Sequence, residues 1–98
     1  MKRHLPLLAL FATLLLAGAC QSKSDKNNNA ALRLGQRHAK ELTESKLSDK
    51  ELQFRLLEIR ANETMIRNNC GNETAEIYVT SFTDYIKAHN DSLAQLIL

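Results

Sequence analysis

One segment in the middle of the chain carries both the start signal and the stop signal of a helix. Ser48 and Glu51 stand three residues apart, the spacing of a capping box, in which each side chain accepts a hydrogen bond from the backbone N–H of the other residue. Gly71 stands where helices commonly end in a left-handed residue. We therefore predict a helix from about Asp49 to Cys70.

The apolar side chains of this predicted helix fall on two faces. At about 100° per residue, one face holds Leu52, Leu56, Ile59, Ile66 and Cys70. The nearly opposite face holds Phe54, Leu57, Ala61 and Met65. A helix with two apolar faces needs two partners. Either the flanking helices of a three-helix bundle cover both faces, or the first helix packs loosely and the face of Phe54 binds another subunit or protein.

A further helix is expected directly after Gly71, over about 73–97. Its core-facing residues recur at alternating steps of three and four: Ala75, Tyr78, Phe82, Tyr85, His89, Ser92 and Leu96. Because the connection is so short, the two helices should form an antiparallel hairpin.

A first helix over about 30–45 is indicated less strongly. Its apolar stripe of Ala31, Leu34, His38 and Leu42 is thin, and Gly35 lowers the helix propensity. The predicted fold class is all-α. The chain should form a small three-helix bundle, or a helical hairpin with a loosely packed first helix.

The first nineteen residues have the three parts of an export signal. Lys2 and Arg3 supply positive charge, the segment Leu5–Ala17 is almost entirely apolar, and small residues precede Cys20. The apolar run of 13 residues is shorter than the roughly 20 that a membrane-spanning helix needs. We predict a signal peptide over residues 1–19.

The sequence Ala17-Gly18-Ala19-Cys20 resembles the lipobox of bacterial lipoprotein signal peptides. The resemblance implies cleavage between Ala19 and Cys20 and a diacylglycerol on the Cys20 sulfur. Such a lipid would anchor the protein firmly to a membrane. Gln21 after the cysteine, in place of aspartate, implies the periplasmic face of the outer membrane more than the inner membrane.

The lipobox departs from the family pattern at Ala17, where Leu, Val or Ile is usual. Ala17 and Ala19 together also fit ordinary secretory cleavage. The alternative is therefore a soluble exported protein with an unmodified Cys20, which could form a disulfide bond with Cys70. If Cys20 is acylated, Cys70 should be a buried thiol or form an intermolecular disulfide.

The positive charge of the chain belongs to the predicted signal peptide. Without Lys2 and Arg3, the 13 Lys and Arg residues become 11, which equals the number of Asp and Glu residues. Binding to nucleic acid through a basic surface is therefore unsupported. Residues 20–29 are polar and low in complexity, so we expect a lipidated cysteine and a flexible tether there, followed by a helical domain over residues 30–98.

The predicted domain contains no motif for a catalytic, metal or cofactor site. His38 and His89 belong to no metal-binding spacing, and each lies on a predicted packing stripe, where a partly buried, hydrogen-bonded histidine is expected. Glu63 should pair with His89 or Arg67. The aromatic residues of the last helix should be core contacts, and the remaining charged residues should lie on solvated faces.

The functional expectation is a non-enzymatic lipoprotein that is tethered to a membrane and makes protein–protein contacts in the cell envelope. Phe54, Leu57, Ala61 and Met65 are its candidate partner surface, for another protein or for self-association. An envelope-structural role would resemble small peptidoglycan-linked lipoproteins. Those proteins end in a wall-linked lysine, whereas this sequence ends in Leu96-Ile97-Leu98.

Overall fold

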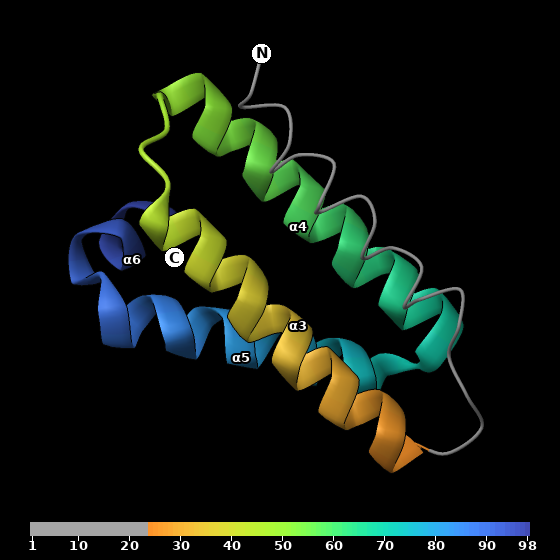
Figure 1. Ribbon diagram of the computed structural model, residues 1–98. Coiled ribbons are helices and arrows are strands. Elements are labelled where there is room, and N and C mark those ends of the chain that lie inside the picture. Colours follow the sequence, from red (N-terminus) through yellow and green to blue (C-terminus); the bar gives the residue numbers. More distant parts are fainter. Residues whose placement is uncertain (1–23) are drawn as a thin grey trace.

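The computed structural model describes residues 24–98, which form four helices and no strand (Figure 1). The helices are α3 (Ser24–Glu44), α4 (Asp49–Cys70), α5 (Asn72–His89) and α6 (Asp91–Ile97). The all-α fold class is confirmed. The predicted signal peptide and the predicted lipidation site, Cys20, lie outside the described residues.

The helices form a bundle in which α3 and α5 make the most extensive contact (Figure 1). α4 packs against α5 as the predicted hairpin and lies to one side of the α3–α5 pair. The bundle alternative is therefore correct. The expectation of a loosely packed first helix is wrong, because α3 is the main packing partner of α5.

Small side chains allow α3 and α5 to approach closely. Ala31 and Ala39 are fully buried on α3, and Gly35 lies between them on the same face. A Cβ atom on Gly35 would lie 2.0 Å from Oγ of Ser81 and 2.4 Å from the carbonyl oxygen of Tyr78. The glycine that lowers helix propensity is thus the residue that permits the crossing.

The two ends of α4 are those that the sequence predicts. The backbone N–H of Glu51 donates to Oγ of Ser48 over 3.2 Å, and the backbone N–H of Ser48 donates to the Glu51 carboxylate over 3.0 Å. Gly71 has a φ of 103°, and its N–H donates to the carbonyl of Arg67. A residue with a side chain is strained at that φ, which is why a glycine can connect α4 to α5 in a single residue.

The other boundaries differ from the predicted ones. α3 begins at Ser24, so residues 24–29, which were expected in a tether, are helical. The Thr74 hydroxyl donates to the Asn28 side chain over 2.6 Å and thereby joins this first part of α3 to α5. The single helix expected over 73–97 is broken at Asn90, whose side chain accepts from the N–H of Leu93 and caps α6.

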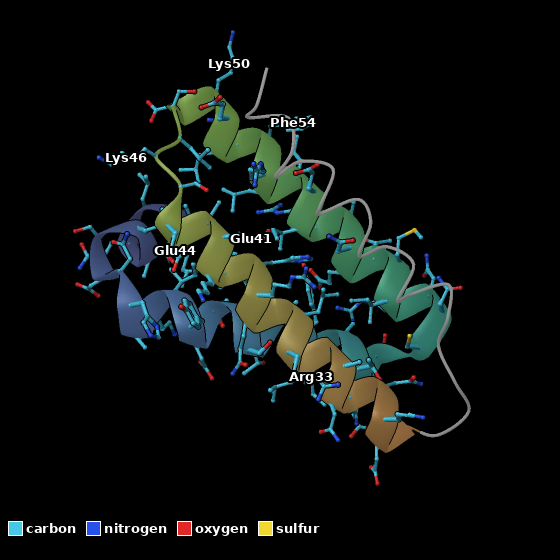
Figure 2. The ribbon with its side chains drawn as sticks, in the orientation of Figure 1. Arg33, Glu41, Glu44, Lys46, Lys50 and Phe54 are labelled. Carbon is cyan, nitrogen blue, oxygen red and sulfur yellow. The ribbon has the colours of Figure 1, made fainter. Side chains whose placement is uncertain are left out.

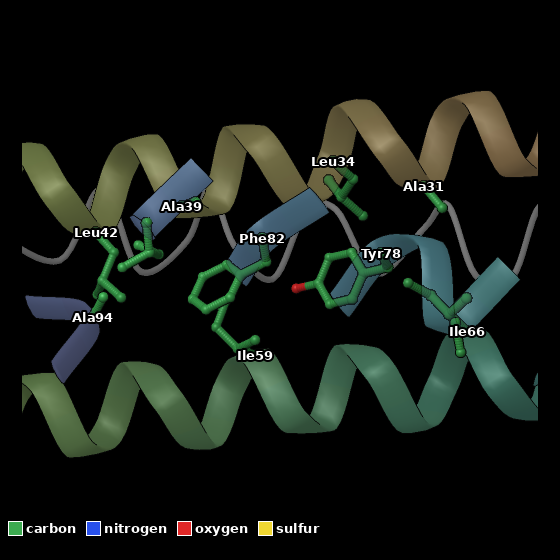
Figure 3. Packing of buried hydrophobic residues seen from close by; sticks show 11 residues of the cluster. Ala31, Leu34, Ala39, Leu42, Ile59, Ile66, Tyr78, Phe82 and Ala94 are labelled. Carbon is green, nitrogen blue, oxygen red and sulfur yellow. The ribbon is translucent and has the colours of Figure 1, made fainter. Parts of the chain in front are cut away.

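The core lies where α3, α4 and α5 meet (Figure 3). It consists of Ala31, Leu34, Ala39, Leu42, Ile59, Ile66, Ala75, Tyr78, Phe82, Ile86 and Ala94. Tyr78 and Phe82 are core contacts, as predicted. At the C-terminal end, α6 places Ala94 beside Leu42, while Leu96 and Leu98 are exposed (Figure 3).

Candidate functional site: the outer face of α4

Four apolar side chains on one side of α4 remain exposed on the folded bundle. The exposed fraction is 47% for Phe54, 64% for Leu57 and 37% for Met65, and Ala61 is also exposed. We call these four residues the α4 outer face. Figure 2 shows Phe54 on the side of α4 turned away from α3 and α5. The expectation that neighbouring helices cover both faces of α4 is wrong for this face. The alternative combined an exposed stripe with a loosely packed first helix, and of these two features the structure has the exposed stripe.

The reason is that α3 and α5 both lie on the same side of α4. Ile59 and Ile66 turn toward them and are buried. The packing therefore uses one face of α4 and leaves the second without a partner among the described residues.

Two cations lie near the α4 outer face. The exposed charged side chains of α4 are Lys50, Arg60 and, at the first residue of the helix, Asp49. The other carboxylates of α4 are half-buried or buried. The α4 outer face is thus an apolar strip whose flanking exposed charges, from Lys50 to Asn69, are cationic.

The inner side of α4 carries charge that the sequence analysis placed in solvent. Arg55 and Glu58 are only 5% and 7% exposed, and Nε of Arg55 lies 3.8 Å from Oε1 of Glu58. Burial raises the pKa of the Glu58 carboxyl, and the Arg55 charge opposes this shift. Neither carboxylate oxygen of Glu58 has a hydrogen-bond partner among the described residues.

A second carboxylate faces the same guanidinium from α3. Burial raises the pKa of Glu41, and the charges of Arg37 and Arg55 oppose the shift. Arg37 forms an i,i+4 ion pair with Glu41, with Nε 3.9 Å from Oε2. Arg55 is therefore the ion-pair partner of Glu58 and also lowers the pKa of Glu41, to which Arg37 is the nearer cation.

A buried hydrogen-bond network lies beside this charge cluster. Nδ1 of His38 is 2.7 Å from the hydroxyl oxygen of Tyr78, and the two rings meet edge to face. Burial, reinforced by the charge of Arg37, lowers the pKa of His38 to about 4. Burial raises the pKa of Tyr78, while a hydrogen bond from Asn62 acts in the opposite direction. Asn62 of α4 thus acts on the same phenol group that His38 contacts from α3.

This arrangement confirms His38 as a buried, hydrogen-bonded histidine. Its neutral imidazole joins α3 to α5 through Tyr78 and to α4 through Asn62. A satisfied polar network of this kind fixes the relative positions of helices. No pattern in the sequence singles out Asn62 as a neighbour of this pair.

A groove with a cavity volume of about 590 Å³ lies between α3 and α5. Its lining residues are Leu32, Gln36, Glu73, Glu76, Ile77, Thr80, Ser81, Asp84, Tyr85, Ala88 and His89. No residue of α4 lines this α3–α5 groove, and neither do His38 and Tyr78. The groups with the largest pKa shifts are therefore out of its reach.

His89 is exposed at one end of the α3–α5 groove rather than partly buried, so its predicted packing role is wrong. Its ring stacks on Tyr85 with 3.9 Å between the ring centroids, and its Nδ1 lies 3.0 Å from the Tyr85 carbonyl oxygen. The break at Asn90 explains the difference, because the stripe expected to continue through His89 ends there. Tyr85 is half-buried.

Glu63 pairs with Arg67, one of its two predicted partners. Arg67 also lies 3.7 Å from the Glu76 carboxylate and donates to the Asn72 side chain. These contacts brace the α4–α5 connection.

Cys70 is half-buried against the core and is disulfide-bonded. The expectation of a buried thiol is therefore wrong. Cys20 is the only other cysteine of the chain and lies outside the described residues.

The residues that the structure describes hold no cluster of three or more His, Cys, Asp or Glu side chains suited to a metal ion. Over the same residues, no helix combines the length and the apolar character needed to cross a bilayer. Comparisons with protein-family models, curated proteins and solved structures give no match.

Proposed function

We propose that this chain is a small, non-enzymatic, lipid-anchored protein of the bacterial cell envelope that binds a protein partner through the α4 outer face. The observation that carries the proposal is the exposure of Phe54, Leu57 and Met65 in one row on a folded bundle. Met65 follows Phe54 by eleven positions, so the row is about 16 Å long at the rise of an α-helix. Contiguous apolar surface of this kind is typical of interaction sites.

The residue types of the α4 outer face support a protein partner. Phenylalanine and methionine are enriched in protein interfaces, where a few large side chains supply most of the binding energy. The face lies on a helix whose ends are fixed by a capping box and by Gly71, so it is rigid before binding. A rigid face loses little conformational entropy when a partner binds.

The anchor and the location are supported by the sequence of residues 1–20. A cysteine after Ala17-Gly18-Ala19 has no role in ordinary secretory cleavage, whereas it is the acylated residue in the lipobox. A lipid on Cys20 would hold the domain at the membrane surface and raise its effective concentration near envelope partners.

The experiment is crosslinking in intact bacteria that express the full chain with a photoreactive residue in place of Leu57. The proposal predicts a discrete crosslinked product that disappears when Met65→Glu is added. The matched control places the same residue at Gln95, which is exposed on α6 and lies off the α4 outer face. Equal crosslinking from both positions, or a product that Met65→Glu leaves unchanged, would contradict a docking role.

A second candidate function is a soluble exported protein that binds its partner through the α4 outer face and has no lipid anchor. In this candidate Cys20 pairs with Cys70, and the disulfide at Cys70 favours it. A Cys20 sulfur in a thioether to lipid is not available for a disulfide. Metabolic labelling with a palmitate analogue separates the two candidates. Label that is lost in Cys20→Ser supports the anchor, and an unlabelled chain that gains two free thiols on reduction supports the disulfide.

A further inference from the structure

We propose that the α4 outer face of one molecule docks into the α3–α5 groove of a second copy, so that molecules associate head to tail. This inference rests on the proposed docking role of the α4 outer face and names its partner. It follows from the charge, the apolar character, the dimensions and the placement of the two surfaces.

The charges of the two surfaces are complementary. Lys50 and Arg60 border the α4 outer face, and the one exposed carboxylate of α4 is that of Asp49, five residues before Phe54. The lining of the α3–α5 groove contains the carboxylates of Glu73, Glu76 and Asp84, of which Glu76 is 3.7 Å from Arg67, and it contains no lysine or arginine. Opposite borders of this kind favour encounter and set the orientation of docking.

The apolar parts also correspond. The groove contains Leu32, which is 42% exposed, together with Ile77, Tyr85 and Ala88. It follows α5 from Glu73 to His89, a length of about 24 Å at the rise of an α-helix. The row of the α4 outer face, about 16 Å long, fits within that length. Docking would cover the most exposed apolar side chains of α3 and α4 together.

The two surfaces share no residue, because no α4 residue lines the groove. Each molecule can therefore use both surfaces at once, and the contact is heterologous. Such a contact builds rings or open chains of molecules rather than a closed pair.

Pairing of two α4 outer faces with each other is the competing arrangement. It would place Arg60, which is near the middle of the row, beside Arg60 of the other molecule, with no exposed carboxylate between Lys50 and Asn69 to compensate the two charges. Like charges across an interface oppose binding. The α3–α5 groove is thus the better-matched partner.

The test mixes two variants of the full chain, each lacking one surface. Leu57→Glu removes the α4 outer face, and Leu32→Glu removes the groove. Sedimentation in the analytical ultracentrifuge should show that the wild-type protein forms larger oligomers as its concentration rises. Each variant alone should stay monomeric. An equimolar mixture of the two variants should form a one-to-one dimer and nothing larger, because one intact face meets one intact groove.

Several outcomes would overturn the inference. They are a wild type that stays monomeric, a Leu32→Glu chain that associates alone, or two folded variants that stay monomeric when mixed. Ala88→Glu is the second groove variant if circular dichroism shows that Leu32→Glu does not fold. The charge contribution is tested by Arg60→Glu, which should weaken the association at least tenfold. Lys40→Glu, an exposed change on neither surface, should leave the association unchanged.

Failure of this inference is distinguishable from failure of the proposed function. A crosslink from position 57 to a different protein, with none to the α3–α5 groove of a second copy, overturns head-to-tail association and leaves the docking role. Absence of any crosslink from position 57 removes both.

Discussion

Gly35→Ala should destabilise the bundle, although alanine is the better helix former. Helix propensity alone predicts a gain of about 1 kcal/mol for this change in a helix interior. The new methyl group, however, would lie 2.4 Å from the backbone carbonyl oxygen of Tyr78, and ordinary contacts of this kind begin at 3.4 Å. The carbonyl belongs to the α5 backbone, so α3 and α5 must separate by about 1 Å, the difference between these two distances.

A gap of that size removes a quarter to a half of the attraction between atoms in contact. Ala31 and Ala39, the buried alanines on either side of Gly35, would also lose contact with α5. The loss of stability should therefore lie near the upper end of the range for overpacked cores, about 1–3 kcal/mol. After the propensity gain, we expect a net loss of about 2 kcal/mol. For a domain of this size the melting temperature should fall by about 8–16 °C.

Urea and thermal unfolding followed by circular dichroism measure this change. The control is the double variant Gly35→Ala, Ser81→Ala, which removes the 2.0 Å contact with Oγ of Ser81 and keeps the backbone contact. It should recover part of the loss. A Gly35→Ala chain that is as stable as wild type, or more stable, would refute the close crossing of α3 and α5.

Three further changes test the interior and the α4 outer face. The pKa of His38 is lowered in the folded chain to about 4, so its contribution to stability, about 3 kcal/mol, is present above pH 6.5 and is lost as the pH falls toward 4. Between pH 6.5 and 4, the free energy of unfolding should fall less in His38→Gln than in the wild type. The same dependence on pH in both proteins would contradict a buried neutral imidazole. Arg55→Ala should cost about 3 kcal/mol at pH 7, because it leaves the Glu58 carboxylate buried without its cation, while the half-buried Glu41 keeps its ion pair with Arg37. The pKa values of Glu58 and Glu41 are raised, so the cost of Arg55→Ala should shrink as the pH falls and these carboxyls take up protons. The control Arg60→Ala should change stability by less than about 0.5 kcal/mol throughout this pH range. Leu57→Glu should leave the melting temperature nearly unchanged, because the Leu57 side chain is 64% exposed. A chain that this substitution unfolds would show that the α4 outer face belongs to the core.

The local signals in the sequence predict α4 well because they depend only on near neighbours. Ser48, Glu51 and Gly71 define its ends without reference to the rest of the chain. The same reasoning could have found the break at Asn90, since Asn90-Asp91-Ser92 is a run of capping residues inside an otherwise helical pattern. The prediction of one helix over 73–97 followed the apolar periodicity, which continues across Asn90.

Features that depend on how helices cross could not be predicted in this way. Periodicity shows that α4 has two apolar faces, but it does not show whether its neighbours lie on opposite sides or on one side. Gly35 has two consequences, a weaker helix and a closer approach, and only the position of α5 decides between them. Arg55 and Asn62 lie within about 60° of Ile59 around the helix, so their burial follows from which face α3 and α5 cover.

Oxidative footprinting of the α4 outer face tests the central claim most directly. Hydroxyl radicals would be applied to the dilute purified chain and to bacteria that express it, and oxidation at Phe54 and Met65 would be compared with that at the buried Tyr78. We predict ready oxidation of Phe54 and Met65 in the dilute chain, strong protection of both in cells, and low oxidation of Tyr78 in each. Protection of Phe54 and Met65 already in the dilute chain, or equal oxidation in the two samples, would contradict a face that is exposed by the fold and covered by a partner.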